Sequence, residues 1–382
     1  MRKKLKILFV SHELDPYSNG ESKFIYNCAF YFLRKGNEVH LLAYGAHKDI
    51  LEKGAIFNKI PRIIKRPVLF KTLFFILYIS FKFKKKKYDL IHISGPVYPF
   101  PHHINTCQFV HSAYKRYIRH INFPILRKIY YILNYNIGSF IEKVVYKKSK
   151  KIIAVSNKIK RELIRYVKVK PERIEVIYNG VDPEEFPFKK GYEKEKLIRE
   201  NDFLKGKLIF LFAGDIRSNR KGIESLIRAF KNVREDISLI VLGDPKTSPY
   251  PKLVKKLNLE DKVKFLGFKK NISFYYRAAD FFVFPTYYEP FGIVILESLS
   301  SGTPVLASDK RFCGGTELIK EGFNGFIIKN PFKIKEIEKT IKKAIKNKEK
   351  LEELKLNSKE SVKKVYFENI FKKYEEIYLK VI

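Results

Sequence analysis

Short apolar runs alternate with amphipathic stretches along the whole chain. In the first half, a helix is expected near Ser22 to Lys35, between the first two runs. The runs in this half are KILFV (6–10), NEVHLLAYG (37–45), YDLIHISG (88–95), INTCQFVHS (104–112), KKIIAVS (150–156) and RIEVIYNGVD (173–182). Strands that alternate with helices in this way predict parallel βαβ units.

The pattern restarts after a charged, proline-containing stretch at residues 181–196. The second series of runs is KLIFLFAGDI (207–216), SLIVLGD (238–244), VKFLGF (263–268), FFVFPT (281–286) and PVLAS (304–308). From Pro331 onward the chain is rich in Lys and Glu and is expected to be helical. We therefore predict two doubly wound α/β domains, 1–183 and 184–365, followed by a C-terminal helix, 366–382, that packs back on the first domain.

A proline- and glycine-containing turn follows the buried run at 281–286, in the stretch EPFGIVILESLSSGTPVLAS (289–308). The residues from Ile293 to Ser300 have helical length and stop at Gly302. The amides of Phe291, Gly292 and Ile293 would then lie at a helix N-terminus, where phosphate groups are commonly held.

Two carboxylates flank this predicted anion site. Glu289 precedes the helix, and Glu297 lies one turn inside it with a side chain that leans toward the N-terminus. Carboxylates repel phosphate, so their natural partners are hydroxyl groups, such as those of a sugar or a ribose. The predicted ligand is a sugar joined through a diphosphate to a nucleoside, unless both residues are simply solvated.

Composition limits the remaining possibilities. The chain has 382 residues and three widely spaced cysteines, which indicate neither a disulfide framework nor a thiolate metal site and fit a reducing cytoplasm. The longest apolar run, Thr72 to Phe81, is too short to span a bilayer. Of the net charge of +37, residues 51–170 carry +23, from 27 Lys and Arg against four acidic residues. An anionic partner is expected, either nucleic acid or a membrane surface.

Three motifs together carry a family resemblance: ADFFVFPTYYEPFGIVILESLSSGTPVLAS (279–308), IYNGVD (177–182) and GDIRSNRKGIESLIRAF (214–230). In this order they resemble the retaining glycosyltransferases of family 4, and the likeness spans almost the whole chain. The resemblance implies the α/β GT-B fold, with two Rossmann-like domains facing each other across a cleft. Within the family, the chain is most similar to enzymes that build lipopolysaccharide cores.

The resemblance assigns roles in the second domain. Glu289 would contact the donor sugar, Glu297 would bind the ribose, and the amides of Phe291, Gly292 and Ile293 would hold the diphosphate. A basic pair before a glycine completes the phosphate site in this family, and here it falls on Arg220, Lys221 and Gly222. The usual arginine directly after the strand glycine is replaced by Asp215, so Arg217 or Arg220 could fill that role; we favour Arg220 with Lys221.

In the first domain the resemblance implies a glycine loop near the donor phosphate and a histidine at a strand end. These fall on Gly20, which follows Asn19, and on His111, which could hydrogen-bond a donor-sugar hydroxyl. No Asp-x-Asp triplet occurs, so we expect no metal and no cofactor. Retention would follow from front-face attack, with the leaving phosphate accepting the acceptor's proton.

Cationic and apolar residues occur together in two segments of the first domain, RPVLFKTLFFILYISFKFKKKKYD (66–89) and HSAYKRYIRHINFPILRKIYYILNY (111–135). This pattern is typical of peripheral membrane attachment. The predicted docking residues are Lys82, Lys84, Lys85, Lys86, Lys87, Lys115, Arg116 and Arg119. The alternative is an ordinary solvated face above a packed apolar core. Docking would place the protein in the cytoplasm, on the inner face of the cytoplasmic membrane.

The function favoured by these observations is transfer of a hexose from a nucleotide-diphosphate sugar, with UDP as the favoured nucleotide, to a glycolipid or lipopolysaccharide-type acceptor. A nucleotide-sugar epimerase or a phosphorylase of the same fold is an alternative. A nucleic-acid-binding protein would explain the charge but not Glu289 and Glu297. The sequence specifies neither the hexose, the base, the acceptor nor the oligomeric state.

Overall fold

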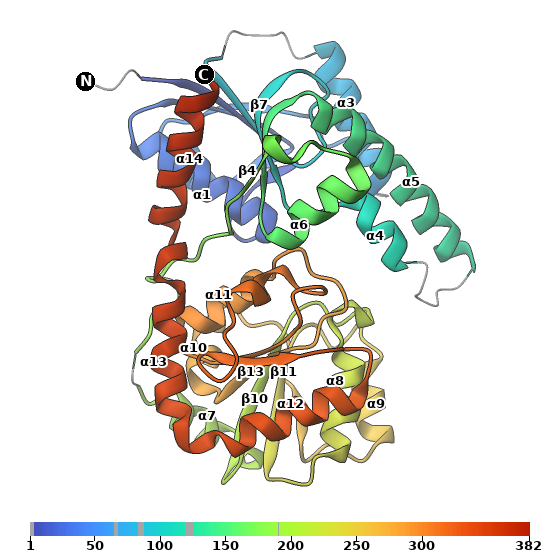
Figure 1. The fold of residues 1–382 in the computed structure, drawn as a ribbon, viewed down its shortest axis with the longest axis vertical. Helices are drawn as coiled ribbons and strands as arrows, with labels where there is room; N and C mark the ends of the chain where they lie inside the picture. Colours follow the sequence, from blue (N-terminus) through green and yellow to red (C-terminus); the bar gives the residue numbers. More distant parts are fainter. Residues whose placement is uncertain (1–3, 65–67, 83–87, 119–124, 190) are drawn as a thin grey trace. The chain divides into compact units, whose positions relative to one another are not determined.

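The computed structural model describes the chain except for residues 1–3, 65–67, 83–87, 119–124 and 190. The chain divides into two compact units, one formed by Met1–Asn179 with Phe367–Ile382 and one by Gly180–Tyr366 (Figure 1). We call them unit 1 and unit 2. Each contains a parallel β-sheet with helices connecting its strands.

Unit 1 is built on a seven-stranded sheet in the order β5-β3-β1-β6-β7-β8-β9, in which every pairing is parallel. The strands are β1 Lys6–Val10, β3 Glu38–Ala43, β5 Ile56–Lys59, β6 Leu90–Ser94, β7 His102–Cys107, β8 Ser149–Ala154 and β9 Ile174–Val176. The helices are α1 Gly20–Arg34, α2 Lys48–Glu52, α3 Val68–Lys82, α4 His111–Ile118, α5 Ile125–Lys147, α6 Asn157–Glu162 and α14 Phe367–Val381. A short parallel pair, β2 Glu13–Leu14 and β4 Gly45–Ala46, lies after β1 and β3.

Unit 2 is built on a six-stranded parallel sheet in the order β12-β11-β10-β13-β14-β15. The strands are β10 Leu208–Ala213, β11 Ile237–Leu242, β12 Val263–Phe265, β13 Phe281–Phe284, β14 Val305–Ser308 and β15 Gly325–Ile328. The helices are α7 Glu193–Glu200, α8 Ile223–Asn232, α9 Tyr250–Lys256, α10 Ile272–Ala278, α11 Ile293–Ser300, α12 Ile334–Lys346 and α13 Leu351–Val362. All residues of β10, β11, β13 and β14 except Leu208 are buried, as strands covered on both faces should be.

The strand order of each sheet reverses at one point. In unit 1 the chain builds outward from β1 to β3 and β5, then continues on the other side with β6; in unit 2 the reversal lies between β10 and β13. Ligands of doubly wound sheets bind beyond the carboxyl ends of the strands at such a switch point. The loops after β1 and β6, and after β10 and β13, are therefore the places to look for a site.

The C-terminal helix α14 belongs to unit 1. Its aromatic side chains pack on α1, with the ring of Tyr378 stacked on Phe32 at 4.5 Å between centroids. Tyr378 Oη also contacts Nδ1 of the buried His92, whose Nε2 lies 2.8 Å from Thr106 Oγ1. Tyr374 Oη completes this buried polar cluster at 3.0 Å from Thr106 Oγ1. The cluster fixes the helix on the sheet by hydrogen bonds as well as by apolar burial.

Three strands differ from the sequence expectation. Strands β5 and β15 were not anticipated, and the expected strand over residues 104–112 ends at Cys107. His111 therefore does not lie at a strand end but is the first residue of helix α4. The apolar pair Phe109 and Val110 extends the strand-like pattern, yet it belongs to the turn that leads into this helix.

Candidate functional site

The switch point of unit 2 brings the basic triplet and Glu289 together. Strands β10 and β13 are parallel neighbours, so the loops that follow them begin at the same edge of the sheet. The backbone carbonyl of Arg220 accepts from the Tyr287 amide at 2.9 Å and from Thr286 Oγ1 at 3.1 Å, which joins the two loops. Residues 66 and 67 positions apart in sequence thereby become direct neighbours.

Glu289 forms ion pairs with both cations of the triplet. Its Oε2 contacts Lys221 Nζ and lies 3.3 Å from Arg220 Nη1, which also donates to the Tyr288 carbonyl at 3.0 Å. The side chains of Lys221 and Glu289 are each only 13% exposed. Burial lowers the pKa of Lys221, and the charge of Glu289 partly offsets that shift. Two cations against one carboxylate leave this group with an excess positive charge.

Only glycine fits at position 222. Gly222 adopts a left-handed conformation (φ 73°), and a Cβ atom there would lie 1.9 Å from the carbonyl oxygen of Pro285. The loop after β10 can therefore approach the loop after β13 closely only because no side chain intervenes. This contact holds Lys221 against Glu289.

Helix α11 starts at the residue expected from the sequence, Ile293. Its N-cap is Gly292 (φ 92°), which makes no side-chain hydrogen bond, and the first amides of a helix have no acceptor within the helix. A Cβ at Gly292 would meet Glu289 Cγ at 3.2 Å, so the cap lies directly against the acidic side chain. The positive end of the helix is thus adjacent to the two cations, an arrangement suited to an anion.

Glu297 is held by a residue that the sequence did not single out. Tyr276, on α10, donates from its hydroxyl to Glu297 Oε2 at 3.1 Å. Tyr276 itself is fully buried, and burial, reinforced by the charge of Glu297, raises its pKa well above the ordinary value. Its hydroxyl therefore stays protonated and can serve only as the donor to Glu297. A tyrosine inside an apolar helical pattern gives no signal of such a role.

Arg217 is placed differently from Arg220. Its guanidinium makes a bidentate pair with Asp215, from Nε to Oδ1 at 2.9 Å and from Nη2 to Oδ2 at 2.7 Å, and its side chain is largely exposed. The hydrogen bonds from Arg217 lower the pKa of Asp215. Of the two candidates for the diphosphate contact, Arg220 is the one that lies beside Glu289.

Unit 1 has a cavity of about 250 Å³ at its own switch point, beyond β1 and β6. Its polar lining residues include His12, Glu21, Ser94, Gln108 and His111. Ser94 Oγ donates to Glu21 Oε1 at 2.7 Å, and burial raises the pKa of Glu21. Burial also lowers the pKa of His12 to about 3. His111, which the sequence singled out, thus borders a cavity whose lining combines polar and apolar side chains.

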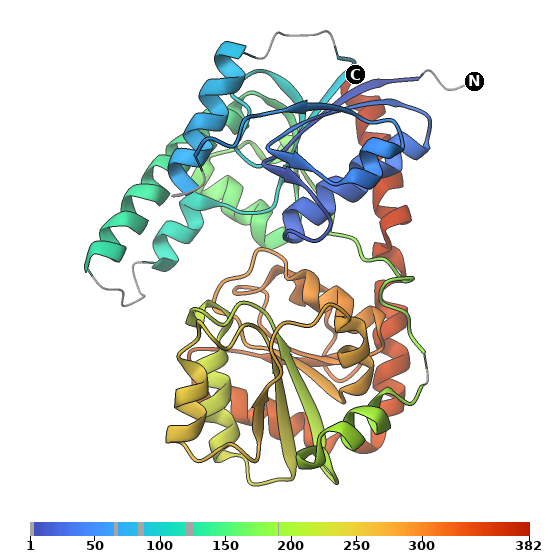
Figure 2. The ribbon, with the colours of Figure 1, turned by 180° about the vertical axis from the view of Figure 1, so that it is seen from behind.

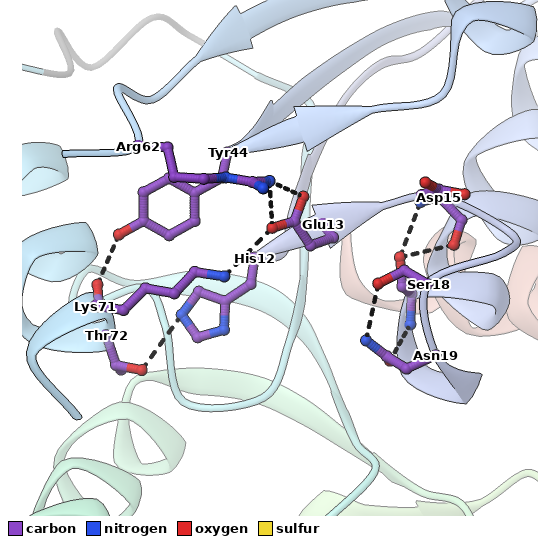
Figure 3. Close-up of polar contacts among 10 residues, drawn as sticks. His12, Glu13, Asp15, Ser18, Asn19, Tyr44, Arg62, Lys71 and Thr72 are labelled. Atoms are coloured by element: carbon purple, nitrogen blue, oxygen red, sulfur yellow. Dashed lines mark hydrogen bonds and ion pairs between the residues drawn. The ribbon is translucent and has the colours of Figure 1, made fainter. Parts of the chain in front are cut away.

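Gly20 begins helix α1 and is exposed. The preceding Asn19, labelled in Figure 3, is the N-cap, and its side-chain oxygen accepts from the Ser22 amide at 3.0 Å. In the same view, Arg62 and Lys71 converge on Glu13, with Arg62 Nη2 at 2.6 Å and Lys71 Nζ at 3.3 Å from its Oε1. These contacts tie β2 to α3 and the segment before it; Gly20 takes part in none of them.

The predicted docking cations are only partly described. Lys84, Lys85, Lys86, Lys87 and Arg119 lie outside the described residues, and Lys82 ends helix α3. Lys115 is half-buried on α4, and the Arg116 guanidinium lies 4.8 Å from the ring centre of Tyr166. Within the described part of the chain, no helix is long and apolar enough to cross a membrane. The same residues contain no group of three or more potential metal ligands.

Comparisons with known proteins place these observations in a family. A model described as Glycosyl transferases group 1 matches residues 193–361, and one described as Glycosyltransferase Family 4 matches residues 18–185. An uncharacterized glycosyltransferase of Methanocaldococcus jannaschii, MJ1178, is 30% identical over 359 residues, which cover 90% of this chain and 91% of the relative.

Other relatives match over a shorter span. The lipopolysaccharide glucosyltransferase WaaG of Escherichia coli is 26% identical over 202 residues, 52% of this chain and 54% of WaaG. A second M. jannaschii glycosyltransferase, MJ1607, is 35% identical over 188 residues, 47% of each protein. These two matches span about half the length of each relative.

Solved structures share the fold of the whole chain. The crystal structure of WaaG covers 98% of this chain and 99% of its own, with a TM-score of 0.79 at 19% identity. The Anabaena protein HepE, solved with UDP and glucose, covers 98% of this chain and 100% of its own, with a TM-score of 0.74 at 19% identity. The two parallel-sheet units thus have the GT-B fold. Together with the full-length relative and the two family models, they show that the chain belongs to the family 4 glycosyltransferases.

Proposed function

We propose that the protein is a retaining hexosyltransferase that uses a nucleotide-diphosphate sugar, with UDP as the favoured nucleotide, and a membrane-associated glycolipid acceptor. One observation carries this proposal: Glu289, paired with Lys221 and Arg220, lies directly before the N-terminus of α11. The cations that can bind a diphosphate, Arg220 and Lys221, thus lie beside a carboxylate that can accept hydrogen bonds from sugar hydroxyls. WaaG by name is a lipopolysaccharide glucosyltransferase, and HepE was solved with UDP-glucose, which supports both halves of the assignment.

Each residue of the site has a defined task under this proposal. The amides at the start of α11, with Arg220 and Lys221, hold the diphosphate, while Glu289 accepts from donor-sugar hydroxyls and Glu297 from the ribose. As the glycosidic bond breaks, the departing nucleotide gains negative charge. Fixed cations beside it stabilise the transition state more than the bound donor, which raises the rate.

We further propose front-face attack without a metal or other cofactor. The acceptor hydroxyl loses its proton to a leaving phosphate oxygen, and the new bond forms on the face from which the nucleotide departs, so the anomeric configuration is retained. The support for this step is the positive charge of the site itself. Arg220, Lys221 and the N-terminus of α11 can neutralise the diphosphate, which a metal ion does in other enzymes. Addition of EDTA should leave turnover unchanged.

A nucleotide-release assay tests the donor site. The protein is incubated with individual nucleotide sugars and a membrane lipid extract, and both released nucleotide and labelled lipid are measured. Glu297→Gln should lower kcat/KM for the donor at least about tenfold, since a charge-assisted hydrogen bond is lost. The matched control is Glu352→Gln on α13, whose side chain is 65% exposed and forms an ion pair with Lys355 at 2.9 Å. Equal turnover of the two variants refutes the site; an epimerised nucleotide sugar without transfer favours the epimerase.

Peripheral attachment through unit 1 completes the proposal. Helices α3 and α5 contribute Phe75, Ile79 and Val145 to one buried apolar cluster, yet α3 leaves Leu77 54% and Phe81 82% exposed. Both helices lie at one end of unit 1 in the two views (Figures 1 and 2). Further exposed apolar residues on them are Phe70, Ile129, Leu133, Phe140 and Val144. Such side chains entering the headgroup region, with cations nearby, give reversible binding to an anionic surface, which we place at the inner face of the cytoplasmic membrane.

Vesicle flotation tests this attachment. The protein should float with vesicles that contain anionic lipid and stay behind with neutral ones, and Leu77→Asp with Phe81→Asp should abolish flotation. Phe268→Asp, at an 80% exposed position in unit 2, is the matched control and should float normally. Equal binding to neutral vesicles, or to nucleic acid in preference to lipid, contradicts the assignment of the positive charge to a membrane.

A further inference from the structure

Glu142 of helix α5 is a fully buried acidic residue outside the donor site described above. Its side chain is 0% exposed, and its two oxygens lie within hydrogen-bonding distance of four groups of the first turn of α4. Oε1 contacts the His111 amide and lies 2.9 Å from His111 Nδ1. Oε2 accepts from the Ser112 amide at 3.0 Å and from Ser112 Oγ at 2.8 Å. Nothing in the sequence pattern indicates a role for this residue, because it lies 31 positions from the histidine that it contacts.

The imidazole of His111 is also confined on its other sides. Gly138 lies one turn before Glu142 on α5, and a Cβ there would come within 2.8 Å of His111 Cδ2 and 3.1 Å of Cγ. The ring of Phe109 lies edge-on at 5.1 Å and that of Tyr135 at 6.0 Å between centroids. His111 lines the cavity of unit 1 with a side chain that is 29% exposed. With Nδ1 directed at Glu142, Nε2 is the ring nitrogen left for the cavity.

We infer that Glu142 is a positioning residue for His111. Its carboxyl group keeps a proton on Nδ1, so that Nε2 is presented to a sugar hydroxyl in the cavity, and the missing side chain at Gly138 leaves the space that the ring occupies. Which nitrogen of a histidine carries the proton is set by the hydrogen bond that the other side of the ring makes. The inference rests on the proposed function for the role of Nε2, but the proton on Nδ1 is a property of the chain alone.

A purely structural role makes a different prediction. Glu142 accepts from two backbone amides at the start of α4, so its loss would destabilise that helix whatever the histidine does. A capping residue alone would not set the proton position on the ring. The position of the ring proton therefore separates the two roles.

The first measurement is the ¹⁵N spectrum of the histidine side chains in the full chain, with the His111 signal assigned by its loss in His111→Asn. The wild type should show a proton on Nδ1. In Glu142→Gln one of the two acceptor oxygens is replaced by an amide NH2 that can donate to Nδ1, so the proton should move to Nε2. Glu162→Gln is the matched control, since it removes a buried partner of Lys158 elsewhere in unit 1 (2.6 Å; side chains 13% and 4% exposed), and should leave the signal unchanged. A wild-type ring protonated on Nε2 alone, or no change in Glu142→Gln, overturns the inference.

The second measurement is donor turnover. Glu142→Gln should lower kcat/KM about tenfold or more relative to Glu162→Gln, because a misplaced group loses the productive geometry. Gly138→Ala displaces the ring while keeping the carboxyl group, so it should reduce turnover but retain the Nδ1 proton; this variant also covers the case in which Glu142→Gln does not fold. Equal turnover of Glu142→Gln and Glu162→Gln overturns the inference. If the wild type releases nucleotide from none of the nucleotide sugars tested, the proposed function fails. The ¹⁵N spectrum still decides whether Glu142 determines which nitrogen of the His111 ring carries the proton.

Discussion

Mild acid should unfold unit 1 before unit 2. All eight histidines of the chain lie between residues 12 and 120, so unit 2 contains none. Three of them have a strongly lowered pKa: loss of hydration lowers the pKa of His12 to about 3, with further lowering by Lys71 and His111, and burial lowers that of His92 to about 3 and that of His102 to about 4. These three imidazoles are neutral in the folded unit at neutral pH.

The sign and size of the effect follow from proton binding. An unfolded histidine has a pKa of about 6.5, far above the folded values, so below that pH the unfolded chain binds more protons than the folded one. The free energy of unfolding of unit 1 therefore has its full value above about pH 6.5. It falls by about 1.4 kcal/mol per histidine for each pH unit below that. At pH 5 the three together cost on the order of 6 kcal/mol, which is comparable to the whole stability of a typical domain.

Hydrogen exchange with peptide resolution, at pH 7.5, 6 and 5, reports on both units in one sample. Peptides from β1, β6 and β7 should lose protection as the pH falls, while those from β10, β11 and β13 keep it. Replacing His92 by Gln should make the stability of unit 1 less dependent on pH, by about 1.4 kcal/mol for each pH unit below 6.5. Equal loss of protection in the two units, or a unit 1 whose stability does not change between pH 7 and 5, would refute the reasoning.

Three further predictions concern single contacts. Arg220→Ala should lower donor kcat/KM by about tenfold or more in the nucleotide-release assay, whereas Arg217→Ala should change it little; the reverse order would transfer the diphosphate contact to Arg217. Gly222→Ala should lower the free energy of unfolding by at least about 2 kcal/mol more than Gly267→Ala, because both have positive φ (73° and 75°) but only the first would clash; equal urea midpoints would count against the close approach. Tyr378→Phe should cost about 1–3 kcal/mol in urea unfolding, since a buried imidazole loses its partner; a neutral result would show that the contact contributes nothing net.

The elements around the donor site were predictable because their signals are local. A four-residue apolar strand, a turn with proline and glycine, and an eight-residue helix occupy consecutive positions, and α11 has the bounds expected from the sequence. Gly292 caps this helix in the left-handed conformation (φ 92°), which glycine adopts without strain. Local geometry of this kind depends on neighbouring residues, which the sequence displays directly.

Contacts between distant residues were not predictable in the same way. Nothing in the sequence pairs Tyr276 with Glu297 or Glu142 with His111, because each acceptor is set by how two helices pack. The predicted location of His111 at a strand end was wrong for a related reason. An apolar pair directly after a strand continues the strand pattern in the sequence, although these two residues form the turn that leads into α4. Packing of one element on another decides these cases, and it leaves little trace in a single chain's periodicity.

The pairing of Glu289 with two cations also bears on how a donor can bind. In the structure as it stands, Lys221 and Arg220 share the Oε2 atom of Glu289, and Lys221 is nearly buried. A buried cation without a partner would be costly, so the carboxylate keeps the site folded before the donor arrives. Under the proposed function, an incoming diphosphate replaces Glu289 as partner of these cations and releases the carboxylate to accept from the sugar. Binding is then an exchange in which the cations keep an anionic partner and the carboxylate gains hydroxyl donors. The same exchange couples binding of the phosphates to the contact with the sugar.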